Sequence, residues 1–127
     1  MYIGFNNNPS GKRVGDCSVR AISKILGMIW EDAYIALVTE GFKYHDMPSS
    51  PYVIGMLLQR HGFQMRTIPN MCPFCTSVEQ FANDHSLGKY VLFSQDHVVA
   101  VIDGDYYDSW DSGDEIVLYY FEEGDDL

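Results

Sequence analysis

The chain has 127 residues, of which 46% are apolar and 14% aromatic, and its net charge is −10 at pH 7. This length and composition predict one folded domain over residues 1–127 with a sizeable core, and they exclude a disordered tail. The acidic balance argues against a nucleic-acid partner, because binding phosphates over a broad surface requires a basic face. No run approaches the roughly 18 apolar residues that span a bilayer, and the N-terminus lacks the hydrophobic region of a signal peptide. We therefore expect a cytoplasmic protein without membrane attachment.

Residues 1–5 are typical of a short strand or extended arm, and the Asn, Pro, Ser and Gly of residues 6–11 predict a turn. A first helix is predicted over 16–27, because Asp16 is a favourable N-cap. Apolar residues then recur at helical spacing, namely Val19, Ile22, Leu26 and Ile29. Cys17 therefore occupies the first position of this helix.

A second helix is predicted over 30–41. Its one-sided stripe is expected in the core, namely Trp30, Ala33, Tyr34, Leu37, Val38 and Gly41. A third helix begins where Ser50 and Pro51 give an N-cap followed by proline, and it ends at Gly62. Its predicted buried positions are Ile54, Leu57, Leu58 and His61.

The next segments connect these helices to the second half of the chain. Residues 63–68 alternate weakly and predict a strand, and residues 69–75 predict a loop. Residues 76–79 match a capping box, with Thr76 and Glu79 as its ends, that opens a fourth helix ending at Gly88. The residues of this helix expected to face inward are Val78, Phe81 and Ala82.

The second half has the periodicity of β-strands. Four runs rich in β-branched and aromatic residues are separated by turn residues, namely 90–93, 97–102, 105–110 and 116–121. Asp103-Gly104 is a strong hairpin signal. Helices followed by strands with short connections predict an α+β fold with an antiparallel sheet. The segment 122–127, which is acidic from Glu122 to Asp126 apart from Gly124, is expected to form a frayed tail.

Cys17 is the candidate nucleophile. At the first turn of a helix, the partial positive charge of the helix terminus and the unpaired backbone N–H groups favour a thiolate. Four of the eight Lys and Arg residues lie near it in the sequence, namely Lys12, Arg13, Arg20 and Lys24. Such a cluster would lower the pKa of the thiol further. The alternative is that Cys17 is a small buried hydrophobic residue without a chemical role.

A cysteine nucleophile needs a base, and His97 at the start of a predicted strand is the candidate. If Asp103-Gly104 forms a two-residue turn, His97 lies diagonal to Asp108, and the two side chains share one face of the sheet. A turn shifted by one residue keeps them on that face but farther apart. A three-residue loop would place them on opposite faces. The remaining histidines have no carboxylate placed in this way, namely His45, His61 and His85.

Cys72 and Cys75 form a CxxC pair in the predicted loop. A structural zinc site requires four ligands, and the chain has no second CxxC. His61 or His85 would have to complete a site, but their spacing matches no zinc module. An odd number of cysteines without an export signal also argues against a disulfide framework. We therefore predict an inert loop, and neither a metal nor another cofactor.

The order of a helix-terminal cysteine, a strand histidine and a strand Asp-Ser-Trp run resembles the papain-like cysteine peptidase superfamily. In that family the third residue commonly stands in an Asn-Ser-Trp run, and Asp108-Ser109-Trp110 matches it with Asp in place of Asn. The stretches around Cys17 and His97 also resemble small papain-like proteins of bacteria and their phages. The resemblance spans essentially the whole chain. It implies a helical part whose nucleophile helix packs on a C-terminal antiparallel sheet.

The resemblance also implies roles for individual residues. Cys17 would be the nucleophile, His97 the general base and acid, and Asp108 the residue that orients the imidazole. Trp110 would shield the contact between His97 and Asp108. The family usually has a glutamine shortly before the cysteine that helps to bind the oxyanion, and Gly11 stands there in this chain.

The missing glutamine leaves the second oxyanion donor to other residues. The backbone N–H of Cys17 supplies one donor. Asn6, Asn7 and Asn8 are the candidates for the other, and we favour Asn8. The alternative is that all three merely form turns.

The resemblance implies a cysteine hydrolase that cleaves a peptide or isopeptide bond in a peptide or protein substrate through an acyl-enzyme. The alternative function is a catalytically weak or inactive papain-like binding module of phage or mobile-element origin that engages a host protein. In that case the missing glutamine is a sign of lost activity. The sequence decides neither the identity of the substrate nor between a monomer and a dimer.

Overall fold

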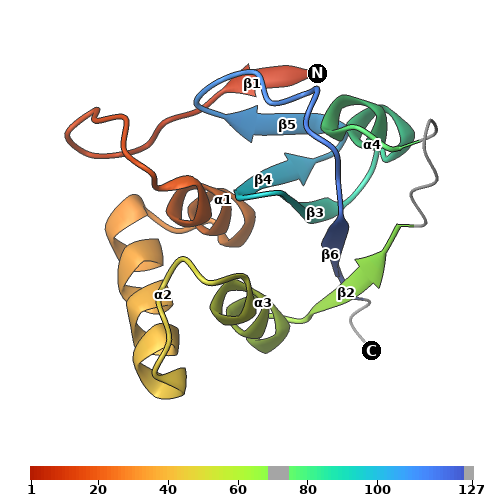
Figure 1. Cartoon of the computed structure of the whole chain (residues 1–127). Helices are drawn as coiled ribbons and strands as arrows, with labels where there is room; N and C mark the ends of the chain where they lie inside the picture. Colours follow the sequence, from red (N-terminus) through yellow and green to blue (C-terminus); the bar gives the residue numbers. More distant parts are fainter. Residues whose placement is uncertain (69–74, 125–127) are drawn as a thin grey trace.

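A six-stranded sheet runs through the part of the chain that the computed structural model describes, residues 1–68 and 75–124 (Figure 1). The strands lie in the order β1-β5-β4-β3-β6-β2. Their bounds are β1 Tyr2–Gly4, β2 Phe63–Thr67, β3 Lys89–Ser94, β4 His97–Ile102, β5 Asp105–Asp108 and β6 Tyr119–Glu123. The helices of this part are α1 Cys17–Leu26, α2 Trp30–Tyr44, α3 Pro51–Arg60 and α4 Val78–Asp84. The predicted α+β class is therefore confirmed.

The sheet is mixed, which corrects the prediction of a wholly antiparallel sheet. Strand β1 pairs parallel with β5, with Tyr2 opposite Tyr106, whereas the other neighbouring strands pair antiparallel. Because β1 and β5 come from opposite ends of the chain, no tight turn dictates their relative direction. The predicted strand at residues 63–68 is β2, which pairs with β6 at the other edge.

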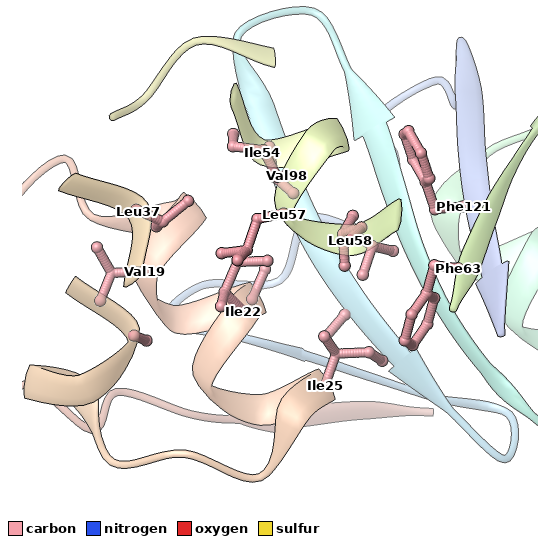
Figure 2. Close-up of a cluster of buried hydrophobic side chains, with 14 of the residues drawn as sticks. Val19, Ile22, Ile25, Leu37, Ile54, Leu57, Leu58, Phe63, Val98 and Phe121 are labelled. Carbon is pink, nitrogen blue, oxygen red and sulfur yellow. The ribbon is translucent and has the colours of Figure 1, made fainter. Parts of the chain in front are cut away.

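Helices cover both faces of the sheet, because successive residues of a strand point to opposite sides. On one face α1, α2 and α3 pack together, and Figure 2 shows Ile22, Leu37 and Leu58 in this cluster with Val98 of β4. On the other face, Phe81 of α4 belongs to a second cluster. Figure 1 shows α4 apart from the other three helices. Burial on both faces explains why the central strands are apolar nearly throughout rather than alternating.

Two predicted strands have different bounds in the structure. Strand β5 ends earlier than predicted, at Asp108, where the carboxylate accepts a hydrogen bond from the N–H of Ser109 at 2.8 Å. Strand β6 begins later than predicted, at Tyr119. The preceding segment instead forms a single bridge between Ile116 and Ser77. A local hydrogen bond therefore accompanies the end of β5, whereas the segment before β6 bonds to the distant residues Thr76 and Phe93.

Strand β6 also extends into the predicted frayed tail, residues 122–127. Glu122 and Glu123 belong to β6 and pair with β2. Glu122 accepts a hydrogen bond from Nε of Arg66 at 2.8 Å. These two acidic residues are therefore held in the sheet, which corrects the predicted tail, and residues 125–127 lie outside the described part.

The buried face of α2 differs from the predicted stripe. Ala33, Leu37 and Gly41 are buried as predicted, but Tyr34 and Val38 are exposed. Helix α2 packs against α1 and α3 but lies away from the sheet, so only the narrow row facing those two helices is covered. The outer apolar residues of α2 remain at the surface.

Helix α4 begins at a different cap from the predicted one. Ser77, rather than Thr76, is the N-cap, and its side chain accepts a hydrogen bond from the N–H of Gln80 at 3.1 Å. The helix ends at Asp84, before Gly88. Its inward-facing residues are buried as predicted, namely Val78, Phe81 and Ala82.

The core on the α3 face allows a stability prediction. Leu58 has no exposed surface and lies in the cluster shared by α1, α2 and α3. We expect Leu58→Ala to lower the free energy of unfolding by about 2–5 kcal/mol, because the smaller side chain leaves a cavity. Leu87 is 78% exposed, and the matched change Leu87→Ala is expected to alter it by no more than about 0.5 kcal/mol. Urea unfolding followed by circular dichroism measures both, and equal effects would contradict this packing.

Candidate active site

Cys17 begins α1 and opens onto a cavity. Asp16 is the N-cap residue, so Cys17 occupies the first helical position, as predicted. Its side chain is partly buried and forms no disulfide. The cavity has a volume of about 340 Å³ and is also lined by His97. Other residues around it come from α1, the start of α3, the β3–β4 turn and β6, and include Ser18, Pro51, Asp96 and Tyr119.

The hairpin of β4 and β5 brings His97 to Asp108. Its turn, Asp103-Gly104, has positive φ at both residues, 49° and 84°, and places Ile102 opposite Asp105. This is the two-residue turn for which His97 and Asp108 are predicted to share one face of the sheet. Nε2 of His97 lies 2.5 Å from Oδ2 of Asp108. Because the carboxylate engages Nε2, Nδ1 is the ring nitrogen left for the thiol.

The surroundings of Cys17 favour the thiolate. Burial alone raises the pKa of the thiol, but hydrogen bonding to the His97 side chain and the Val98 backbone lowers it. The positive charges of His97 and Arg20 lower it further. The pKa of Cys17 therefore lies below its ordinary value of 9.0. A thiolate is the reactive form of a cysteine.

The surroundings of His97 favour the imidazolium. Burial alone lowers its pKa, but hydrogen bonds to Asp108 and Cys17, together with their negative charges, raise the pKa from 6.5 to about 9. The lowered pKa of Cys17 and the raised pKa of His97 both favour transfer of the thiol proton to the imidazole. These shifts therefore favour an ion pair of the two residues beside the cavity.

Asp108 is completely buried and accepts hydrogen bonds at both oxygens. Besides His97, Oδ2 accepts from the hydroxyl of Ser112 at 2.6 Å. Oδ1 accepts from the N–H of Ser109 at 2.8 Å and from Nη2 of Arg20 at 3.1 Å. Burial raises the pKa of this carboxyl, but the hydrogen bonds from His97 and Ser112 hold the pKa below 3.8. Asp108 is therefore ionised, and donors on both sides fix its plane.

Trp110 lies beside His97, as the resemblance implies. Their ring centroids are 5.1 Å apart, and the indole is 46% exposed, so it covers the histidine from the solvent side only in part. Ser112, which also contacts Asp108, was not predicted. It lies in a loop, where no periodic pattern marks its position.

Arg20, one of the cations predicted near Cys17, forms two ion pairs that were not predicted. Its buried guanidinium pairs with Oδ1 of Asp16 through Nη1 and with Oδ1 of Asp108 through Nη2. Oδ2 of Asp16 accepts a hydrogen bond from Nε1 of Trp30 at 3.0 Å. The spacing of Asp16 and Arg20 along one helix is the signal that could have indicated their pairing. No local spacing connects Arg20 to Asp108.

The other three cations near Cys17 in sequence are placed elsewhere. Lys12 and Arg13 are exposed. The ammonium of Lys24 lies over the ring of Tyr107, 4.2 Å from its centroid. None of the three lines the cavity beside Cys17. Among the described residues, the predicted cationic surroundings therefore consist of Arg20, with His97.

The structure does not bring Asn8 to Cys17. Oδ1 of Asn8 accepts a hydrogen bond from the N–H of Ser10 at 2.9 Å, and Asn8 does not line the cavity. The side-chain amides of Asn6 and Asn7 also donate elsewhere. In the described part of the chain, no side chain caps the start of α1. Its free backbone N–H groups are the donors nearest to the thiol in sequence.

The prediction of an inert CxxC loop depends on Cys72, which lies outside the described residues. Within residues 1–68 and 75–124, no three His, Cys, Asp or Glu side chains are grouped so that they could hold a metal ion. His61 is exposed, although it was predicted to be buried, because it follows the last turn of α3. His85 stacks on Phe81, with ring centroids 3.7 Å apart.

The ion pair allows a prediction about stability and pH. Folding lowers the pKa of Cys17 and raises the pKa of His97, so the two groups change the proton count of the folded chain in opposite directions. Their opposing contributions leave little slope in the free energy of unfolding. In Cys17→Ala, Asp108 still raises the pKa of folded His97 above 6.5, and no thiol opposes this effect. Its stability relative to the unmodified protein should therefore fall as the pH rises above about 6.5, by at most about 1.4 kcal/mol per pH unit.

Urea unfolding at several pH values measures this difference. The double variant Cys17→Ala/His97→Gln is the control, because it lacks both titrating groups and its difference from the unmodified protein should not depend on pH here. A difference for Cys17→Ala that also stays constant as the pH rises above about 6.5 would contradict a pKa of His97 raised by Asp108.

Comparison of the chain with protein-family models, curated proteins and solved structures gives no match. The protein is therefore described by its own fold and candidate site. The fold is an α+β domain with a mixed sheet, and the site is a connected group of Cys17, His97 and Asp108. No helix in the described ranges is long and apolar enough to cross a membrane.

Proposed function

We propose that this protein is a papain-like cysteine hydrolase that cleaves a peptide or isopeptide bond through an acyl-enzyme on Cys17. The observation that carries the proposal is the connected group of three side chains. The thiol of Cys17 has a lowered pKa, the imidazole of His97 has a raised one, and Nε2 of His97 lies 2.5 Å from Asp108. The order of these residues in the chain, and the helix and hairpin that hold them, agree with the papain-like pattern.

In the first half of the reaction, the Cys17 thiolate attacks the carbonyl carbon of the substrate and forms a C–S bond. The carbonyl oxygen becomes an oxyanion, which the N–H of Cys17 and the positive end of α1 stabilise. His97 then gives its Nδ1 proton to the leaving amine as the C–N bond breaks. Asp108 holds the other ring N–H, so the imidazole stays oriented throughout. The products are a free amine and a thioester on Cys17.

In the second half, water hydrolyses the thioester. The neutral His97 takes a proton from the water as its oxygen bonds to the acyl carbon. The second tetrahedral intermediate collapses, the C–S bond breaks, and the acid product leaves. The thiolate of Cys17 and the imidazolium of His97 are restored.

Turnover is expected to be slow. The start of α1 supplies backbone donors, but Asn8 is engaged in its own turn rather than at the cavity. In other hydrolases, loss of one oxyanion donor costs about 100- to 1000-fold in rate. The substrate itself is expected to be neutral or basic near the cleaved bond, because Asp96 lines the cavity and the chain carries a net charge of −10.

A peptide vinyl sulfone tests the proposal. It reacts with activated cysteine nucleophiles, so we expect one covalent adduct per chain on Cys17 near neutral pH, located by mass spectrometry after digestion. The variant Cys17→Ala should carry no adduct. Labelling that is absent in the unmodified protein, or that falls on another cysteine, would count against a hydrolase.

A binding module without catalytic activity is the second candidate function. The observation that favours it is the uncovered outer face of α2, where Ile35 is 62% and Phe42 81% exposed. Apolar patches of this kind often contact another protein. The same vinyl sulfone experiment separates the two candidates, because a binding module needs no reactive Cys17.

A further inference from the structure

The guanidinium of Arg20 connects the two ends of the candidate active site. The side chain is buried, and it lies between Asp16, which precedes the nucleophile, and Asp108, which orients the base. We propose that Arg20 is a positioning residue that fixes Asp108 for His97 and keeps the Asp16 carboxylate away from the start of α1. This inference rests on the proposed function, since it assigns a role within the same site.

The first arm of the proposal concerns Asp108. A carboxylate rotates about the bond to its Cβ unless donors hold both oxygens. Arg20 donates to Oδ1 at 3.1 Å, alongside the N–H of Ser109, and this leaves Oδ2 for His97 and Ser112. A charged guanidinium forms a stronger hydrogen bond to a carboxylate than a neutral donor does. Arg20 therefore directs Oδ2 to the imidazole.

The second arm concerns Asp16. Asp is a preferred N-cap, because its carboxylate normally accepts N–H groups of the first helical turn. Here it makes no such bond: Oδ1 is paired with Arg20, and Oδ2 accepts from Trp30. The Asp16 backbone, at φ −108° and ψ 26°, also departs from the extended conformation of a usual N-cap. The N–H groups next to Cys17 consequently stay free for an oxyanion.

Removing the guanidinium releases this carboxylate. With Oδ1 unpaired, only the hydrogen bond from Trp30 to Oδ2 holds Asp16. The carboxylate can then turn towards the start of α1, where it competes for the N–H groups and places a negative charge beside the thiol. The charged groups around Cys17 are Asp16 at the N-cap of α1, Arg20 on α1, His97 on β4 and Asp96 in the β3–β4 turn, with Asp108 of β5 behind His97 and Arg20. The facing parts of α3 and β6, Pro51 and Tyr119, carry no charge. Losing Arg20 therefore shifts the local balance towards the neutral thiol.

The variants Arg20→Met and Arg20→Lys test this role. The first removes the charge while keeping similar length, and the second keeps a positive charge but cannot donate in the same plane to both carboxylates. Lys24→Met is the matched control, because it removes a cation from the same helix that contacts Phe5 and Tyr107 instead of the acidic residues. Circular dichroism first establishes which variants fold, and Arg20→Lys keeps the test open if Arg20→Met does not.

Two readouts do not require turnover: the pH dependence of iodoacetamide alkylation at Cys17, and the NMR titration of the His97 imidazole. We expect the alkylation midpoint of Arg20→Met to rise by about one pH unit, which is a tenfold lower rate below that midpoint. Arg20→Lys should shift it in the same direction by less, and Lys24→Met should leave it unchanged. Adding Asp16→Ala to Arg20→Met should bring the midpoint back towards that of the unmodified protein.

The inference would be overturned if a folded Arg20 variant kept the alkylation midpoint of Cys17 and the titration of His97 unchanged, even with a lower thermal stability. Arg20 would then contribute only structural ion pairs. A rise that Asp16→Ala does not reverse would overturn the second arm. Failure of the proposed function looks different. In that case the vinyl sulfone does not label the unmodified protein, whereas the alkylation and titration shifts among the variants still report on Arg20.

Discussion

Replacing His97 with alanine is expected to reduce hydrolysis of a quenched-fluorescent peptide pool by on the order of 10⁴-fold. The variant loses the partner that keeps Cys17 ionised and the proton donor for the leaving amine. Asp108 keeps its hydrogen bonds from Arg20, Ser109 and Ser112, so the variant should still fold.

His61→Ala is the matched control for this experiment. His61 is exposed at the end of α3, where its Nδ1 contacts the carbonyl of Leu57, and it lies outside the cavity beside Cys17. Its replacement should leave the hydrolysis rate unchanged. If His97→Ala kept more than about a tenth of the rate of His61→Ala, His97 would not be the general base.

Replacing Asp108 with alanine is expected to have two large effects. The free energy of unfolding should fall by about 3–5 kcal/mol, because Arg20 keeps a buried charge with one partner fewer. Turnover should fall more than alkylation of Cys17, because orientation of His97 matters most when a proton must reach the leaving group. Urea unfolding and the two rate measurements separate these effects.

Asp108→Asn is the informative comparison for this variant. An asparagine oxygen can still accept from Arg20 and Ser109, so most of the stability should return. Its amide N–H₂ then faces Nε2 of His97 and cannot accept a proton from it, which favours the neutral tautomer with the proton on Nδ1. A fully active Asp108→Asn would contradict the need for a carboxylate at this position.

Local chemistry made the hairpin part of the site predictable. Asp103-Gly104 has residues that accept positive φ, and the resulting two-residue turn fixes the register of β4 on β5. The register in turn decides that His97 and Asp108 share a face, and the 2.5 Å contact confirms their proximity. The N-cap residue Asp16 and the helical spacing of the apolar residues likewise predicted that Cys17 is the first residue of α1.

Contacts between distant segments could not be predicted from the sequence. The link from Arg20 to Asp108 depends on how α1 lies against β5, and no local pattern reports that placement. The same holds for β1, whose parallel partner comes from the far end of the chain. Asn8 shows the opposite case. We favoured its side chain as the second oxyanion donor because the glutamine of the family is missing, but a local turn with Ser10 holds it elsewhere.

The pH dependence of iodoacetamide alkylation at Cys17 tests the central claim most directly, because it reports whether the thiol is ionised without requiring a substrate. With His97 bonded to it, Cys17 should react well below about pH 7, and faster than the cysteines of the CxxC pair. In His97→Ala the reaction should shift towards the ordinary thiol value of 9.0. If the unmodified protein instead reacts only above about pH 8, the thiolate–imidazolium pair does not form, and the binding module becomes the better account.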